Sequence, residues 1–224
     1  ALGQMATGIA HELNQPLSAL RSQTFNGSRQ LEHGNTTAVQ VTLAKITALV
    51  ERRSNQIAHI RRFARRPEDE LERVSARQAM VEALALLEHR IDKDQISIDL
   101  APQSEDAFDV VAEQVRLEQI FINLLGNGMD AAVDGADRRL TIAFSRRPGI
   151  VQVRVRDSGK GIAQKEQGQV FDPFFTTKSP GAGLGLGLSI SFNIARDFGG
   201  RLLLEDSSAK GSTFLVELKE WPDV

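Results

Sequence analysis

Apolar residues recur in steps of three and four through the first 66 positions, and this spacing most restricts how the chain can fold. A period of about 3.5 predicts amphipathic helices with a narrow apolar seam. Arg53 breaks the second stripe, and the two stripes are separated at His33-Gly34-Asn35-Thr36, where a helix-ending glycine precedes residues that commonly start helices. We therefore predict a helical hairpin over residues 1–66.

A hairpin of this size cannot bury both of its apolar faces alone. A symmetric dimer that forms a four-helix bundle is the simple solution. The basic run Arg61-Arg62 and Arg65-Arg66 ends at Pro67, and the acidic segment PEDE follows, which indicates a linker near 66–72. We place the first domain at 1–68 and the second at 69–224.

The second part alternates between helical and strand patterns. A hairpin turn is expected at Pro148-Gly149, and a second turn at 208–211. This alternation predicts an α+β domain with helices layered on a mixed or antiparallel sheet. The predicted helices cover 75–89, 113–133 and 184–198, and the predicted strands cover 96–101, 139–145, 150–156, 201–206 and 213–218.

Composition excludes several classes of protein. A net charge of −2 over 224 residues gives no electrostatic reason to expect nucleic acid. The absence of cysteine excludes thiolate metal sites, and the four histidines are too scattered for a zinc cluster. No apolar run approaches the ~18 residues that span a bilayer, and no signal peptide is visible. We expect a soluble piece of a longer protein, whose missing part lies upstream.

His11 lies within the first helical stripe, in the segment HELNQPL. A histidine on a helix is commonly a surface or packed residue. As a nucleophile it needs a neutral ring with one exposed nitrogen and a partner for the other N–H, and Glu12 could be that partner. Gln15 lies four residues later on the same face as His11. Pro16 should kink the helix, either as a hinge or as a tolerated bend.

The glycines at 183, 185 and 187 are spaced too closely for a helix interior. They suit a backbone that approaches phosphates and then opens into a helix, whose N–H groups from Leu186 to Ser189 would face the anion. A flexible hinge is the alternative interpretation. No GxxxxGK[ST] pattern is present, so a P-loop is excluded.

Two further segments are suited to a nucleotide. Asp157 ends a predicted strand and begins a glycine-containing turn, where its carboxylate can accept from an adenine amino group; alone, this is a common turn. Asn123 and Asn127 are spaced i,i+4 on one helix face, and an amide oxygen suits Mg²⁺. Helix capping or a buried polar network are the alternatives for the asparagines.

The five segments HELNQPL, NLLGN, DSGKGI, FDPFFTTK and GAGLGLGLS, in this order, resemble the kinase core of two-component sensor histidine kinases over nearly the whole chain. HELNQPL and GLGLGLSI resemble most the C4-dicarboxylate transport sensor kinases. The resemblance implies a dimeric helical bundle followed by an α/β sandwich that binds ATP and Mg²⁺, of the type shared with gyrase and chaperone ATPases.

The resemblance also implies roles for single residues. His11 matches the phosphorylated histidine and Glu12 its acidic helper, while Gln15 stands where many members have the Thr or Asn that supports dephosphorylation of the regulator. Asn127 matches the magnesium ligand. The implied ATP-binding residues are Asn123, Asn127, Asp157, Gly159, Gly161, Phe174, Thr177, Lys178, Gly183, Leu184, Gly185, Leu186 and Gly187.

The function implied is autophosphorylation of His11 followed by transfer to an aspartate of a response regulator, with control of C4-dicarboxylate transport genes. The protein would be a homodimer, on the cytoplasmic side of a bacterial inner membrane to which a missing upstream segment anchors it. A degenerate kinase acting as a scaffold or as a regulator phosphatase is the alternative. A gyrase-type ATP hydrolase is disfavoured, because those enzymes place a glutamate where this chain has Asn123.

One departure from the family pattern concerns the helix of the asparagines. Members usually have alanine after the second asparagine, where this chain has Gly128. With Gly126 it puts two glycines in one helical turn, each costing up to ~1 kcal/mol relative to alanine. We expect this helix to be locally weakened.

Overall fold

The computed structural model describes residues 23–26, 28–36, 38–43, 46, 71–100, 108–135, 137–178 and 185–222. The chain divides into two compact units, Ala1–Arg65 and Arg66–Val224, and each is described by itself below. The domain boundary that we placed at residue 68 stays a prediction.

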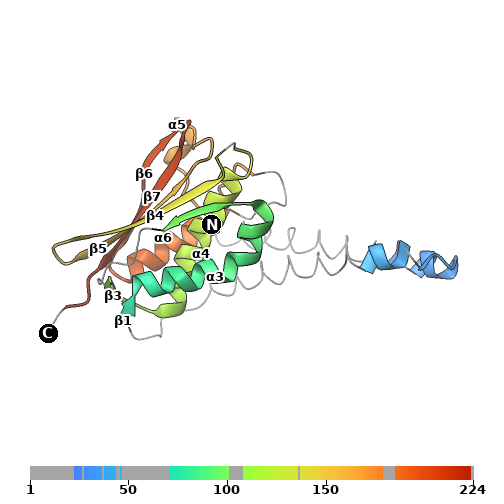
Figure 1. The fold of residues 1–224 in the computed structure, drawn as a ribbon, viewed down its shortest axis with the longest axis horizontal. Helices are drawn as coiled ribbons and strands as arrows, with labels where there is room; N and C mark the ends of the chain where they lie inside the picture. The colour runs from blue at the N-terminus through green and yellow to red at the C-terminus, as the bar shows by residue number, and fades with distance from the viewer. Residues whose placement is uncertain are drawn as a thin grey trace, which may run out of the picture. The chain divides into compact units, whose positions relative to one another are not determined.

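The described residues of the first unit are helical on both sides of a turn at 33–35 (Figure 1). Gly34 has a φ of 71°, and the side chain of Asn35 accepts a hydrogen bond of 3.1 Å from the Ala38 N–H. The turn predicted from the sequence is thereby confirmed, with Asn35 capping the second arm. Thr42 donates to Gln30 at 2.8 Å and joins the two arms. The full length of the hairpin and the four-helix bundle stay predictions.

A five-stranded sheet forms the frame of the second unit, with strand order β2-β4-β5-β7-β6 (Figure 1). β2 pairs with β4 in parallel and all the other pairs are antiparallel, so the sheet is mixed. The strands are β2 (Ser97–Leu100), β4 (Arg139–Arg147), β5 (Ile150–Asp157), β6 (Arg201–Ser208) and β7 (Gly211–Lys219).

Three helices cover one face of this sheet: α3 (Ala76–Asp94), α4 (Gln114–Ala132) and α6 (Gly187–Asp197) (Figure 1). α4 lies between the others, and Leu117, Ile120, Phe121, Leu124 and Leu125 on it are almost completely buried. Their burial against the sheet supplies the main favourable term for this unit. Among the described residues, no helix is both long and apolar enough to cross a membrane.

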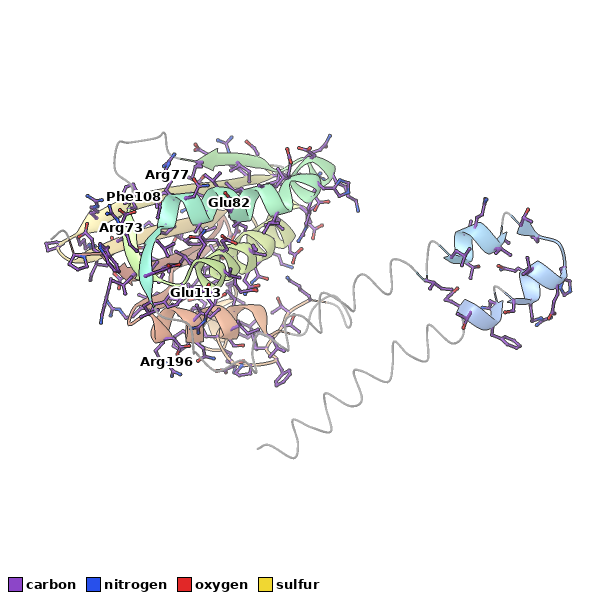
Figure 2. All side chains as sticks on the ribbon, turned by 90° about the horizontal axis from the view of Figure 1, so that it is seen from below. Arg73, Arg77, Glu82, Phe108, Glu113 and Arg196 are labelled. Carbon is purple, nitrogen blue, oxygen red and sulfur yellow. The ribbon has the colours of Figure 1, made fainter. Side chains whose placement is uncertain are left out.

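Among the described residues, three small elements were not predicted. β1 (Glu72–Ser75) and β3 (Asp109–Ala112) form a separate two-stranded antiparallel sheet beside the start of α3. Arg73 on β1 forms an ion pair with Asp109 on β3, and the Arg77 guanidinium lies over the ring of Phe144. Figure 2 labels Arg73 and Arg77 at this end of the second unit. A single short helical turn, α5 (Gln164–Gln167), follows β5.

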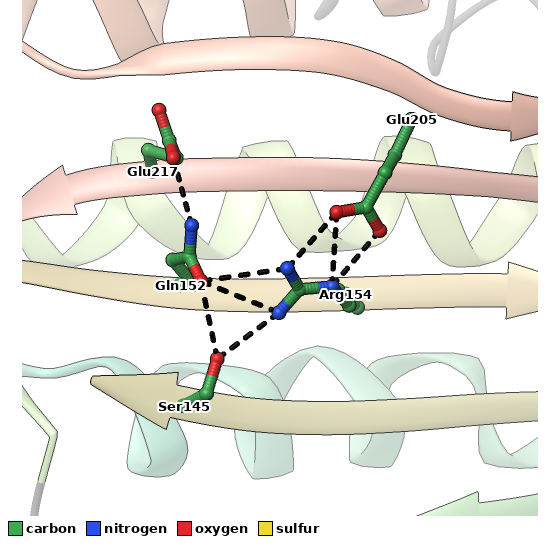
Figure 3. Close-up of polar contacts among 5 residues, drawn as sticks. All are labelled: Ser145, Gln152, Arg154, Glu205 and Glu217. Atoms are coloured by element: carbon green, nitrogen blue, oxygen red, sulfur yellow. Dashed lines mark hydrogen bonds and ion pairs between the residues drawn. The ribbon is translucent and has the colours of Figure 1, made fainter. Parts of the chain in front are cut away.

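The sheet face opposite the helices carries an interlocked polar network (Figure 3). Gln152 donates to Glu217 at 2.8 Å, and Arg154 reaches Glu205 at 2.9 Å. The hydrogen bond from Gln152, together with Arg201, holds the pKa of Glu217 below its ordinary value. These cross-strand pairs let polar side chains cover the middle of the sheet.

The predicted α+β class is confirmed, and its main elements agree with the structure within a few residues. The largest shift is at the end of α3, which continues to Asp94 and does not stop at residue 89, and α6 begins at Gly187 and not at residue 184. Alternating glycines disfavour helical backbone, so the helix starts at the last of them. The turn at Pro148-Gly149 is also confirmed, since β4 ends at Arg147 and β5 begins at Ile150.

Candidate nucleotide site

Asp157 is the last residue of β5 and is only 4% exposed. Its Oδ1 accepts the backbone N–H groups of Gly159 at 2.8 Å and Ser212 at 3.3 Å. Burial raises the pKa of the Asp157 carboxyl, although these hydrogen bonds oppose the shift. Within the described part of the chain, no other residue donates to Oδ2. The carboxylate therefore presents one buried oxygen that can accept from a ligand N–H group.

The loop after β5 is held between α4 and the hairpin of β6 and β7. Gly159 lies so close to α4 that an added Cβ would be 2.5 Å from the Ala131 carbonyl oxygen. Gly161 has a φ of 73°, and a Cβ there would be 1.9 Å from the Ser208 oxygen, so only glycine fits. The Ile162 N–H donates to Ser207 Oγ at 2.7 Å and fixes the end of the loop.

A cavity of about 700 Å³ opens beside this loop. Its size is within the range of small-molecule sites. Its described lining includes the predicted site residues Gly161 and Thr177 but neither Asp157 nor Asn127, so the cavity adjoins the predicted site only through these two residues. The other lining residues are Lys160, Ile162, Ala163, Gln164, Glu166, Gln167, Ser207, Ser208 and Ala209.

Asn123 on α4 is buried and its amide is fully engaged. Its Oδ1 accepts from Gln119 at 3.0 Å, and its Nδ2 donates to the Gly187 carbonyl and to Ser191 Oγ, both at 3.0 Å. The alternative of a buried polar network thus describes Asn123 in this structure. The side chain joins α4 to the first turn of α6, and a direct contact with a nucleotide stays a prediction.

Asn127, one helical turn later, is half-buried, and its Oδ1 accepts from Lys178 Nζ at 3.0 Å. The same ammonium forms an ion pair with Asp130, a residue that the sequence reasoning missed. The available signal was the i,i+3 spacing that puts Asp130 on the face of Asn127. The structure therefore brings together the predicted Asn127 and Lys178 and adds a carboxylate to them.

The segment FDPFFTTK is anchored by aromatic packing. The Phe171 ring lies 5.3 Å from that of Phe192 on α6 and 6.3 Å from that of Phe214 on β7, measured between centroids. Phe174 has a φ of 68°, unusual for a bulky residue, and its N–H donates to the Gly185 carbonyl at 3.0 Å. This hydrogen bond brings FDPFFTTK next to the glycine segment.

α6 starts at Gly187 with Leu186 as its N-cap, and no side chain in the described part of the chain caps this end. The first N–H groups of the helix are therefore open to an anion, which the helix dipole also favours. The remaining predicted residues lie outside the described residues: His11, Glu12, Gln15, Gly183 and Leu184.

Residues 112–222 match the family described as histidine kinase-, DNA gyrase B- and HSP90-like ATPase. The chain is also similar to the crystallised catalytic domain of the histidine kinase ThkA. The two share 30% identity with a TM-score of 0.59, over 68% of this chain and 97% of that one. The chain belongs to the histidine kinase family. Its Arg66–Val224 unit contains the ATP-binding domain of these kinases.

The similarity to relatives also extends over almost the full chain. The C4-dicarboxylate transport sensor protein DctB of Rhizobium meliloti is 36% identical over 221 residues, which are 98% of this chain. The chain spans about a third of the length of this relative, 35%. The crystal structure of ThkA in complex with the response regulator protein TrrA matches 99% of this chain and 62% of that one, with 25% identity and a TM-score of 0.74.

The geometry fits an adenine nucleotide. The matched region contains a buried carboxylate oxygen, a loop with no space for a side chain at position Gly161, and a helix N-terminus without a side-chain cap. The carboxylate oxygen selects for an N–H donor, and the helix N-terminus favours negative charge.

Proposed function

We propose that the chain is the kinase core of a sensor histidine kinase, which binds ATP with Mg²⁺, phosphorylates His11 and passes the phosphoryl group to a response regulator. The observation that carries this proposal is the Asp157 carboxylate, buried at the end of β5 with one oxygen free of other residues of the described chain. To recognise adenine through its amino group, an ATP-binding domain needs a hydrogen-bond acceptor such as this carboxylate oxygen.

In this proposal the residues of the second unit bind and orient ATP. Asp157 Oδ2 accepts from the adenine amino group, and the open N–H groups of α6 and the Lys178 ammonium contact the phosphates. Mg²⁺, held through Asn127, would neutralise charge on the phosphates. Backbone and side chains around the nucleotide come from Asn123, Gly159, Gly161, Phe174, Thr177, Gly183, Leu184, Gly185, Leu186 and Gly187.

The reaction step places His11 as the nucleophile. One ring nitrogen forms a bond to the γ-phosphorus while the bond from that phosphorus to the bridging β,γ-oxygen breaks, and ADP leaves. Glu12 accepts the proton from the other ring nitrogen, which keeps the product neutral at the imidazole. Catalysis depends mainly on positioning and on charge neutralisation.

We further propose a homodimer through the hairpin of residues 1–68. Among its described residues, Phe25, Leu31 and Val41 are large apolar side chains that are 65%, 63% and 51% exposed. A second copy would bury them. The partner for phosphotransfer is a response regulator receiver domain, and the complex of ThkA with TrrA supports this class of partner.

The similarity to DctB supports C4-dicarboxylate transport as the regulated process. In that role the chain would be the cytoplasmic part of a protein anchored in the bacterial inner membrane by an upstream segment. Phosphotransfer measured against a set of response regulators tests this finer assignment, which fails if an unrelated regulator is preferred.

The test of kinase activity is incubation of the purified chain with Mg²⁺ and ATP labelled on the γ-phosphate. We expect protein-bound label that is lost in acid and kept in base, as a phosphoramidate is. His11→Ala should abolish the label while ATP still binds, and Asn127→Ala should abolish it through the nucleotide site. Binding of ATP without labelling would favour the alternative of a scaffold or regulator phosphatase. Turnover that persists in His11→Ala would instead indicate an ATP hydrolase.

A further inference from the structure

Lys178 Nζ occupies a site made of two oxygen atoms from one face of α4. It donates to Asn127 Oδ1 at 3.0 Å and forms an ion pair with Asp130 Oδ2. Asn127 and Asp130 are three residues apart, so their side chains lie next to each other on the helix. An amide oxygen and a carboxylate oxygen thus already contact one cation, the Lys178 ammonium.

The carboxylate of Asp130 is held in place from its other side. Arg90 on α3 forms an ion pair with Asp130 Oδ1 and lies 3.2 Å from Asp94 Oδ2. Burial lowers the pKa of Arg90, but the hydrogen bonds and charges of Asp130 and Asp94 together outweigh it and raise the pKa above its ordinary value. Of the two cations that contact Asp130, Arg90 belongs to helix α3, whereas Lys178 belongs to neither α3 nor α4. The two cations and two carboxylates balance in charge, so the cluster has no capacity for an additional cation unless one of its own leaves.

Resting on the proposed function, we infer that Lys178 and Mg²⁺ exchange at the Asn127–Asp130 pair. Mg²⁺ prefers the same hard oxygen donors that the ammonium now contacts. A divalent ion bound to Asn127 Oδ1 would repel the ammonium on the same oxygen. Lys178 therefore leaves Asn127 when Mg²⁺·ATP binds and contacts the phosphates, while Asp130 becomes a positioning residue for the metal or for its bound water.

The donor set agrees with this assignment. Among the described residues, no group of three or more His, Asp or Glu side chains could hold a metal ion alone. A metal at Asn127 and Asp130 must take its remaining ligands from phosphates and water, which is how Mg²⁺ is commonly bound. The pair would thus hold Mg²⁺ firmly only together with ATP, and Lys178 would occupy it otherwise.

The test compares the dissociation constant of ATP in EDTA with that in Mg²⁺, using the complete 224-residue chain. In Asp130→Asn, we expect the strengthening of ATP binding by Mg²⁺ to fall by about tenfold, with the affinity in EDTA little changed. Asp94→Asn is the matched control, since Asp94 contacts Arg90 but not Lys178. It should keep the full response to Mg²⁺. A response to Mg²⁺ in Asp130→Asn equal to that of wild type would overturn the inference.

Lys178→Met gives an independent readout that needs no nucleotide. Removal of the competing ammonium should raise the affinity for Mn²⁺ about tenfold, measured by the electron paramagnetic resonance signal of free Mn²⁺, while ATP binding in EDTA weakens. An unchanged Mn²⁺ affinity would mean that Lys178 makes only a structural ion pair. Wild type that fails to bind ATP would overturn the proposed function instead, and the Mn²⁺ measurement would still decide the exchange.

Discussion

At the scale of single residues, the Asp157 carboxylate should favour ATP binding and lower the stability of the fold at neutral pH. Its Oδ1 accepts from two backbone N–H groups, which leaves Oδ2 for the proposed contact with the adenine base. In Asp157→Asn the amide oxygen would keep those two hydrogen bonds and turn its NH₂ group toward the adenine amino group. Two donors would then face each other. We expect ATP affinity to fall by about ten- to a hundredfold, measured by titration with a fluorescent ATP analogue.

The same substitution should stabilise the fold at neutral pH. Burial raises the pKa of Asp157 above its unfolded value, so the native state binds the proton more tightly and loses stability as pH rises from the unfolded pKa through the folded pKa. Asparagine carries no such charge. Asp157→Asn should therefore unfold at a higher temperature than wild type at pH 7, with a gap that narrows as pH falls through the folded pKa. A lower unfolding temperature at pH 7 would contradict this account.

Asn123 shows where inference from the sequence ends at this scale. Its position on the face of Asn127 followed from helical spacing, and a polar network was one of its possible uses. The partners that decide between the alternatives, Gly187 and Ser191, are 64 and 68 positions away. Spacing along one helix contains no information about which other element packs against it. Asp130 escaped notice for the same reason, because its partners Arg90 and Lys178 are 40 and 48 positions away.

At the scale of elements, α4 contains two glycines whose substitutions should have opposite effects. The helix continues through both of them, so it is not interrupted where a weak point was expected. An added Cβ at Gly126 would approach Arg90 Nη1 at an ordinary 3.9 Å, whereas one at Gly128 would be 2.7 Å from a methyl of the fully buried Leu140. Gly128 therefore lets α4 lie close to the sheet.

Gly126→Ala should stabilise the second unit by up to ~1 kcal/mol, through helix propensity alone. Gly128→Ala gains the same propensity but must displace Leu140, and overpacking typically costs about 1–3 kcal/mol. Its net effect should be a loss of about 1 kcal/mol. Urea unfolding of the two variants, each serving as control for the other, measures the difference. Equal stabilisation by both would mean that the helix and the sheet separate at no cost.

The elements predicted from the sequence are those with a clear local period or an explicit turn. α3, α4 and the hairpin of β4 and β5 belong to this group. β1 and β3 have four residues each and pair through residues such as Arg73 and Val111, far apart in sequence. No turn joins these two strands directly, so their pairing is set by tertiary structure and not by a local pattern.

At the scale of the whole molecule, the proposed chemistry is divided between two units. The proposed nucleotide-binding residues lie in Arg66–Val224, and the proposed phosphoacceptor lies in Ala1–Arg65. The order of sequence segments predicted this division, since each segment belongs wholly to one part of the chain. How His11 would reach the γ-phosphate in the proposed reaction depends on the placement of one unit against the other, which no local pattern encodes.

The division predicts how the fragment 66–224 should behave alone. It contains the five-stranded sheet and the three helices that bury its core, so it should unfold in one cooperative transition. Its ATP affinity should equal that of the complete chain within about twofold. The loss of a separate unit should change the binding free energy by less than ~0.5 kcal/mol.

The fragment 66–224 should sediment as a monomer, whereas the complete chain and its His11→Ala variant should sediment as dimers. A dimeric fragment would place the dimer contacts in the second unit and contradict the proposal that the exposed Phe25, Leu31 and Val41 of the hairpin meet a second copy.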